Sequence, residues 1–171
     1  MAQTTPPPAA AAKTARQRAR DSFVVMNCVP MTRELQQFAT ATIATATADC
    51  LEQARYGDAA RLFLLTTIDG RFDAARVGIP DNEDPALTLE RLLHEQHPAA
   101  GMAALERARR ALVADPASRR SLCTEIRQYG PPDDDSSYRG TVALAADAAR
   151  AFHPDRTWAT LVTAALDCPA D

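Results

Sequence analysis

Long hydrophobic runs are missing from the sequence. No stretch of about 18 consecutive apolar residues occurs, which is close to the shortest run that spans a bilayer as a helix. The N-terminal residues also lack the apolar core of a secretory signal. We therefore expect no membrane span and an intracellular, most simply cytoplasmic, protein, with organelle targeting by the basic N-terminus left open.

Motifs rich in glycine or cysteine are missing as well. The six Gly residues form no phosphate-binding P-loop, no dinucleotide-binding fingerprint and no nucleophile elbow of a hydrolase. The Cys residues form no CxxC pair and no cluster with His at the spacing of a zinc site. The sequence thus predicts no catalytic residue, no cofactor and no metal, and it favours free thiols that act as small buried apolar groups in a reducing compartment. These thiols are Cys28, Cys50, Cys123 and Cys168.

Large apolar side chains are scarce. Ala accounts for 36 residues, whereas Leu, Ile, Val and Phe together number 31 in a chain of 171 residues. Because Ala buries little area, we expect a thin core in which helices pack closely. A thin core also predicts an apolar stripe that a partner covers.

The first 21 residues differ in composition from the rest. They contain a run of three Pro, a run of Ala and four basic residues before the first acid, Asp21, but no large apolar side chain beyond the first Met. Such a segment cannot dock on a core. We expect residues 1–21 to form a disordered basic arm and residues 22–171 to form a single helical domain. The cations of the arm are Lys13, Arg16, Arg18 and Arg20.

A helical pattern begins at Thr32. Apolar residues from Leu35 to Cys50 recur on one face at about 100° per residue. Thr32 fits an N-cap, and Gly57 fits the position that follows a helix C-terminus. The sequence therefore predicts one helix from Thr32 to Gly57.

The next segment is open to two interpretations. A short helix fits residues 59–67. The Asp69-Gly70 pair that follows is typical of the turn of a β-hairpin. We favour the helix because the residues after the pair form a poor strand, and a hairpin within residues 61–77 stays as the alternative.

Proline defines the helices of the second half. Asp84-Pro85 and Asp115-Pro116 each supply an N-cap followed by Pro at the first helical position. Six or seven short helices predict an all-α domain, built as stacked helical hairpins or as an irregular bundle. The helices expected here cover residues 85–97, 99–114 and 116–129, a helix capped by residues 133–136 that runs to Phe152, and residues 156–167.

A degenerate internal repeat spans residues 99–166. Four positions recur at the same intervals 38 residues later, namely Ala104, Ala108, Ala111 and Pro116 and then Val142, Ala146, Ala149 and Pro154. This spacing resembles the second helix of tetratricopeptide repeats. The resemblance implies stacked helical hairpins with a concave protein-binding surface and no chemistry.

A shorter resemblance lies at residues 64–71. The run from Leu64-Leu65 through Asp69 to Arg71 is similar to the Leu-Leu, aromatic-Asp, Arg segment of rod-shaped plant virus coat proteins. It implies a self-assembling helical protein that coats nucleic acid.

Arginine supplies almost all of the positive charge. Six of these residues lie in two neighbouring predicted helices: Arg107, Arg109, Arg110, Arg119, Arg120 and Arg127. Arg109 falls within the apolar stripe of Leu105 and Leu112, where an unpaired charge is costly. Its side chain must therefore reach solvent at the edge of the stripe or meet a carboxylate of another helix or of a partner.

Glu90, His94 and His97 share one predicted helix and could face a metal ion. A site of this kind needs a further ligand from elsewhere. We favour a solvated helix end, in which His97 interacts with the dipole of the helix C-terminus.

These observations favour a non-enzymatic helical domain for protein–protein interaction, or a scaffold subunit of a larger assembly. The alternatives are a self-assembling protein that coats nucleic acid and a small metal-dependent helical enzyme. We expect protein partners, with nucleic acid as the less favoured alternative. The expected partner-binding residues are Arg16, Arg18, Arg20, Arg107, Arg109, Arg110, Arg120 and Trp158.

Overall fold

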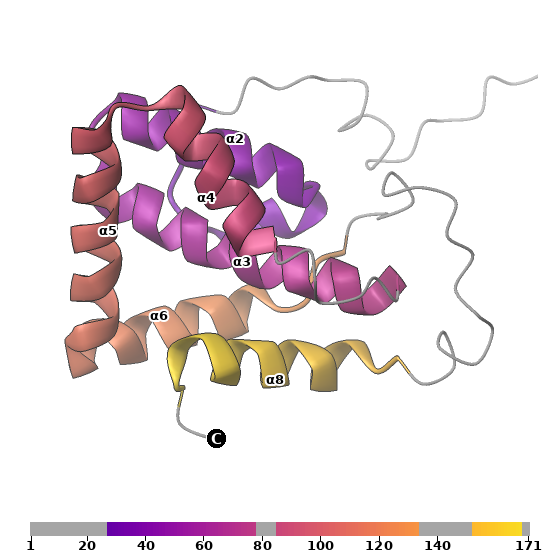
Figure 1. The fold of residues 1–171 in the computed structure, drawn as a ribbon. Helices are drawn as coiled ribbons and strands as arrows, with labels where there is room; N and C mark the ends of the chain where they lie inside the picture. Colours follow the sequence, from indigo (N-terminus) through magenta and orange to yellow (C-terminus); the bar gives the residue numbers. More distant parts are fainter. Residues whose placement is uncertain (1–26, 78–84, 134–151, 169–171) are drawn as a thin grey trace, which may run out of the picture.

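The computed structural model describes residues 27–77, 85–133 and 152–168. Across these ranges the chain is helical and contains no strand, as Figure 1 shows, so the predicted all-α fold class is confirmed. The elements are the 3₁₀ helix η1 (Arg33–Gln37) and the α-helices α2 (Thr40–Glu52), α3 (Tyr56–Val77), α4 (Pro85–Gln96), α5 (Ala99–Ala114), α6 (Pro116–Tyr129) and α8 (Pro154–Leu166).

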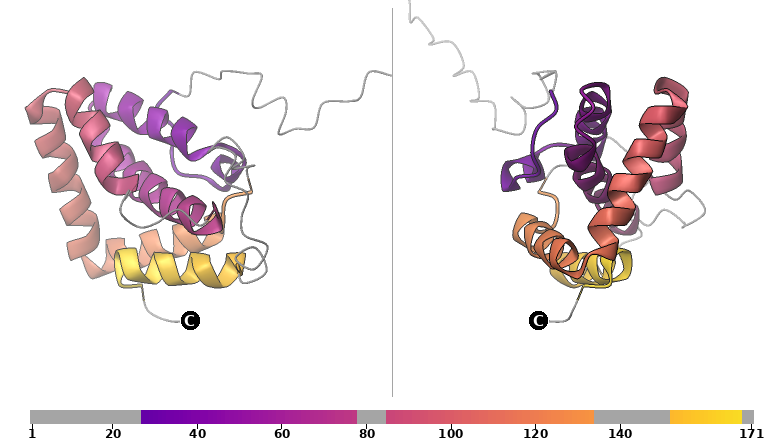
Figure 2. Two further views of the ribbon diagram at one scale, coloured as in Figure 1. Left: turned by 45° about the vertical axis from the view of Figure 1, so that its right-hand side comes forward. Right: turned by 90° about the vertical axis from the view of Figure 1, so that its left-hand side faces the viewer.

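Helix α3 lies at the centre of the fold. It contacts α2, α4, α5 and α8, while α6 and α8 run side by side beneath it (Figures 1 and 2). Every residue from 62 to 70 is buried, which is more than two helical turns. The largest of these side chains include Phe63, Leu65 and Ile68. Helix α3 is therefore covered on all sides by the rest of the fold.

The Asp69-Gly70 pair lies inside α3 and does not end it. The favoured helix is therefore present but longer than predicted, because α3 continues to Val77, and the alternative of a hairpin is wrong. Asp69 and Asp73 are both buried, and they accept hydrogen bonds from the Tyr129 and Thr40 hydroxyls. These tertiary contacts outweigh the unfavourable helix propensity of Gly, which is about 1 kcal/mol.

The helix predicted over residues 32–57 is divided. The chain forms η1, passes through an extended Phe38 and continues as α2, which ends at Glu52. Ala54 follows α2 and has a φ of 54°, which is the left-handed conformation. We had expected Gly57 to occupy this position after the helix. Gly57 instead lies in the first turn of α3. Two helices thus replace the single predicted one.

The helix boundaries that proline predicts are confirmed in the second half. Helices α4, α5 and α6 begin at the predicted residues, and α8 begins two residues before the prediction, at Pro154. The Asp115 carboxylate caps α6 by accepting a hydrogen bond from the Ser118 backbone N–H at 2.7 Å. This hydrogen bond favours the charged form and lowers the pKa of Asp115 below its ordinary value of 3.8.

All four cysteines are paired in disulfides, so the prediction of free thiols is wrong. Cys28 bonds to Cys50, and Cys123 bonds to Cys168, across sequence separations of 22 and 45 residues. The sequence did not reveal these pairs because a disulfide depends on distance in the fold and not on spacing along the chain. The fold brings the Cα atoms to 4.4 and 5.8 Å, within the usual range for a disulfide.

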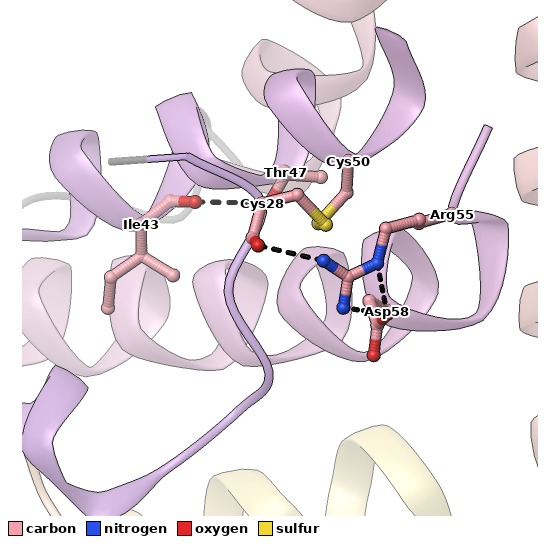
Figure 3. The surroundings of a disulfide bond; sticks show 6 residues. All are labelled: Cys28, Ile43, Thr47, Cys50, Arg55 and Asp58. Carbon is pink, nitrogen blue, oxygen red and sulfur yellow. Dashed lines mark hydrogen bonds and ion pairs between the residues drawn. A yellow bond between two sulfur atoms is a disulfide. The ribbon is translucent and has the colours of Figure 1, made fainter. Parts of the chain in front are cut away.

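The Cys28–Cys50 disulfide holds the segment before η1 against α2. Arg55 adds a second link, because its Nη1 donates a hydrogen bond to the Cys28 carbonyl oxygen at 2.9 Å and its Nη2 pairs with Asp58 at 2.7 Å (Figure 3).

The two disulfides close loops of 22 and 45 residues in the unfolded chain. Closing loops of these lengths stabilises the fold by about 3 kcal/mol for the first disulfide and about 4 kcal/mol for the second.

Several predictions fall on residues outside the described ranges. They include the basic arm of residues 1–21, the boundary at residue 22 and most of the second copy of the internal repeat. The resemblances to tetratricopeptide repeats and to coat proteins stay predictions. Among the described helices, none has the length and apolarity that crossing a bilayer demands.

Candidate binding pocket

A pocket of about 270 Å³ lies where α4 and α5 meet α3. Helix α3 contributes Phe63, α4 contributes two polar residues, and α5 contributes both apolar and charged side chains. The lining residues are Phe63, Glu90, His94, Ala99, Met102, Ala103, Leu105, Glu106 and Arg109. Phe63, Met102 and Leu105 are buried, so the pocket has an apolar base and charged side chains around it.

Helix α4 positions one side of the pocket through its amphipathic pattern. Leu89 and Leu93 are buried in the core, which turns Glu90 and His94 toward the pocket at the flank of the helix. Leu87 lies seven residues before His94 and therefore shares its helical face. The Leu87 side chain is 67% exposed, the most of any large hydrophobic side chain in the described part of the protein.

The charge of Arg109 on α5 is accommodated by an aromatic ring, a carboxylate and solvent. Its guanidinium carbon lies 4.2 Å from the centroid of the Phe63 ring, and its Nη1 pairs with Glu106 at 3.2 Å. The carboxylate thus comes from the same helix, one turn away, and the aromatic ring comes from α3. With 28% of its side chain exposed, Arg109 also reaches solvent, as one of the two alternatives predicted.

The two carboxylates that line the pocket, Glu106 and Glu90, differ in their ion pairs. Glu106 pairs with Arg109 and also lies 3.8 Å from the Nε of Arg110. Glu90 is half-buried, and within the described ranges no cation pairs with it. The uncompensated charge of the pocket is therefore the carboxylate of Glu90.

The three residues of the less favoured metal-site alternative do not come together at the pocket. Glu90 and His94 both line it, whereas His97 does not. Among the residues that the structure describes, no three His, Cys, Asp or Glu side chains are grouped so that they could hold a metal ion. The pocket instead combines an apolar base with polar groups suited to binding.

The predicted partner-binding residues are spread over three environments. Arg107, Arg110 and Arg120 are exposed, and Arg109 lines the pocket. Trp158, which we expected to bind a partner, is only 4% exposed and packs in the core. The three cations of the arm, at positions 16, 18 and 20, lie outside the described residues.

The burial of Trp158 has a clear cause in its aromatic neighbours. Its ring centroid lies 5.8 Å from that of Phe72 on α3 and 5.8 Å from that of Tyr129 on α6. The ring therefore packs between α8 and its two neighbours, α3 and α6. Trp158 belongs to the buried side of α8, together with Val162 and Leu166.

A cluster of polar side chains lies within the core, and the sequence did not predict it. The Tyr129 hydroxyl donates to Asp69 at 3.0 Å, the Thr40 hydroxyl donates to Asp73 at 2.9 Å, and Arg76 pairs with Asp73 at 2.6 Å. The first two contacts join α3 to α6 and to α2. The cluster therefore has a structural role in fixing how these helices pack.

Sequence reasoning also missed the pocket itself. Phe63 was not singled out, and Leu87 was not distinguished from the other leucines of its helix. The available signal was the spacing of Leu87, Glu90 and His94, which puts an apolar residue, an acid and an imidazole along one helical face. That Glu90 and His94 line one pocket together with residues of α5 could not be predicted, because it depends on the angle between two helices.

Comparisons of this chain with protein-family models, with curated proteins and with solved structures found no match.

Proposed function

We propose that this protein is a non-enzymatic helical domain that binds a protein partner through the pocket and the adjoining face of α4, as a subunit of a larger assembly. The observation that carries the proposal is the position of Leu87, exposed on the same helical face as two residues of the pocket. Protein interfaces concentrate their binding energy where an anchoring side chain enters a pocket surrounded by other contacts. Leu87 and the pocket offer such a combination.

The size of the pocket supports a side chain as its occupant. Sites for small molecules and cofactors usually measure about 300 to 1,000 Å³. At about 270 Å³ this pocket is better suited to one anchoring side chain of a partner than to a cofactor.

The arginines of α5 extend the proposed surface. Arg110 lies seven residues after Ala103 and therefore shares the face of α5 that lines the pocket. Its side chain is 70% exposed and lies near Glu106. A charged rim of this kind contributes more to the rate and specificity of association than to its affinity.

Site-specific photo-cross-linking tests the proposal with a control on the same helix. A photoreactive amino acid is incorporated at position 87 or at position 92, and the full chain is irradiated in its native cells. Leu92 is also exposed, at 42%, but lies about 140° around the helix from Leu87. We expect one discrete protein adduct from position 87, lost when Ala103→Trp fills the pocket, and a weaker or absent adduct from position 92.

Two outcomes contradict the proposal. Equal adducts from both positions indicate non-specific proximity, and an adduct from position 87 that survives Ala103→Trp excludes the pocket. Circular dichroism of Ala103→Trp confirms that the variant is folded before the comparison is made.

We also infer that the domain matures in an oxidising compartment, which departs from our intracellular expectation. Two buried disulfides among four cysteines support this inference, because disulfides persist in oxidising compartments and are rare in the reducing cytosol. Alkylation of the protein in intact cells with a mass-tagged maleimide should add no tag. Four tags per chain would contradict it.

A further inference from the structure

The pocket presents different chemistry on its two sides. Helix α4 supplies a carboxylate and an imidazole, at Glu90 and His94. Helix α5 supplies the small side chains of Ala99 and Ala103 and the flexible thioether of Met102. An occupant that matches both sides has a polar, proton-donating end and an apolar stem.

We propose that the anchoring side chain of the partner is basic, an Arg or Lys whose cation binds Glu90 and whose aliphatic stem lies against Met102 and the two alanines. This inference rests on the proposed function and specifies the chemistry of its partner. Long basic side chains bury their methylene stems on apolar surface while the charged end makes polar contacts. A guanidinium or ammonium group that meets a carboxylate forms a charge-assisted hydrogen bond, which is stronger than one between neutral groups.

The charges of the pocket disfavour an acidic anchor. Arg109 already pairs with Glu106 and stacks on Phe63, so its guanidinium is engaged on one edge and on one face. The Nε of Arg109 is buried without a hydrogen-bond partner in the described part of the protein, whereas the carboxylates of Glu90 and Glu106 both line the pocket and would face an acidic occupant. Like charges brought this close repel each other.

A purely apolar anchor is disfavoured for a different reason. It would cover the half-buried carboxylate of Glu90 and remove it from water without supplying a partner. Desolvating a charge without a compensating contact is costly. A basic side chain avoids this cost.

Small probes with short unbranched alkyl stems test the charge preference on the full, disulfide-bonded chain. The cation n-butylguanidinium is titrated against ¹⁵N-labelled protein, and n-butyrate and n-butanol serve as the anionic and neutral probes. We expect saturable shifts of the amide signals of residues 90–94 and 99–109 with n-butylguanidinium, at millimolar affinity that weakens as salt is added. Binding of the other two probes should be at least about fivefold weaker.

A pair of matched variants assigns the contact. Glu90→Gln keeps the size of the side chain but removes its charge, and it should weaken n-butylguanidinium binding about three- to fivefold. Glu95→Gln removes a charge from the same helix at an exposed position, where Glu95 faces Arg91, and should leave binding unchanged. The amide spectra themselves report whether each variant is folded.

The inference is overturned if n-butyrate or n-butanol binds as well as the cation, if Glu90→Gln does not weaken cation binding, or if the pocket signals do not move. Any of these results together with a specific adduct from position 87 leaves the proposed function standing and removes only the basic anchor. Cation binding that depends on Glu90 supports the inference, and the absence of an adduct from position 87 would then count against the proposed protein partner alone.

Discussion

Helices α3 and α4 lie side by side and use their polar and apolar residues in opposite ways. Helix α3 is buried on every side over residues 62–70 and has two carboxylates in the interior, Asp69 and Asp73. In the described part of the fold, helix α4 makes its main contacts with α3 and α5. Its Leu87 and Leu92 side chains are exposed to solvent. One helix buries acids and the other exposes leucines.

This difference shows which residues of each helix are informative. The aspartates of α3 are held by hydroxyl donors from α2 and α6, so their polarity serves the fold. No such structural role accounts for Leu87, which is exposed and shares its helical face with Glu90 and His94, two residues that line the pocket. Exposed apolar residues beside a pocket are candidates for binding, whereas buried and satisfied polar residues are candidates for structure.

The largest effect is expected from Phe72→Ala on α3. The Phe72 ring is buried and packs edge-on against Phe152 and Trp158, at centroid distances of 5.3 and 5.8 Å. Removing it leaves a cavity at the junction of α3 and α8, so we expect a loss of about 3–5 kcal/mol in the free energy of unfolding. Urea denaturation followed by circular dichroism measures the loss. A loss below about 1 kcal/mol would mean that α3 is not the centre of the core.

Leu93→Ala on α4 is expected to have the next largest effect. Leu93 is buried, but α4 is open to solvent on its other side and can settle into the space that the substitution creates. We therefore expect a loss of about 2–3 kcal/mol by urea denaturation, less than at Phe72. The matched control is Leu87→Ala on the same helix, which should change stability by less than about 0.5 kcal/mol. Equal losses at the two leucines would remove the distinction between the two faces of α4.

Tyr129→Phe tests whether the buried acids of α3 are structural. The substitution removes the hydroxyl that donates to Asp69 and keeps the ring that packs on Trp158. Loss of one donor to a buried carboxylate should lower the free energy of unfolding by about 1–2 kcal/mol. Thr40→Val removes the corresponding donor to Asp73 and should act in the same direction. If both variants were as stable as the parent protein, the cluster would not hold the helices together.

In the described part of the second half, local signals in the sequence were sufficient to locate the starts of α4, α5 and α6. Asp115 caps α6 as predicted, and Pro85, Pro116 and Pro154 are each the first residue of a helix. These features depend on a few adjacent residues, and their physical causes act within one turn. The boundaries of α4, α5 and α6 could therefore be predicted closely.

Contacts between distant residues explain the failures. Helix α3 continues through Gly70 because Asp69 and Asp73 find donors 60 and 33 residues away. The disulfides and the burial of Trp158 depend in the same way on how helices pack. The pocket belongs to this group, since the sequence identified Glu90, His94 and Arg109 individually but not their position around one space.

Asp49 on α2 differs from the two buried acids of α3, which each accept a hydrogen bond from a hydroxyl group of another helix, and Asp49→Asn sharpens that difference. Its Oδ2 is buried with no hydrogen-bond partner in the described part of the structure. Burial raises the pKa of Asp49 above 3.8, and the charge of Glu52 raises it further. The charged form is therefore unfavourable in the folded protein, and the variant should be more stable at pH 7, by up to about 0.5 kcal/mol.

The pH dependence of this gain checks its cause. Because the pKa is higher in the folded than in the unfolded protein, the parent protein becomes relatively more stable as the pH falls through the raised value toward 3.8. The advantage of Asp49→Asn in thermal unfolding should thus shrink over that interval. An advantage that did not vary with pH would point to packing instead of charge.

The smallest effect on stability, and the most informative one for function, is expected from Leu87→Ser and Leu92→Ser. Both side chains are exposed on α4, at 67% and 42%, so each substitution should change the free energy of unfolding by less than about 0.5 kcal/mol. Only Leu87 shares the helical face of Glu90 and His94. Pull-down with the partner captured by cross-linking at a second pocket position, 103, should therefore be lost for Leu87→Ser and retained for Leu92→Ser. Loss in both variants would extend the binding surface around α4, and retention in both would mean that the exposure of Leu87 has no part in binding.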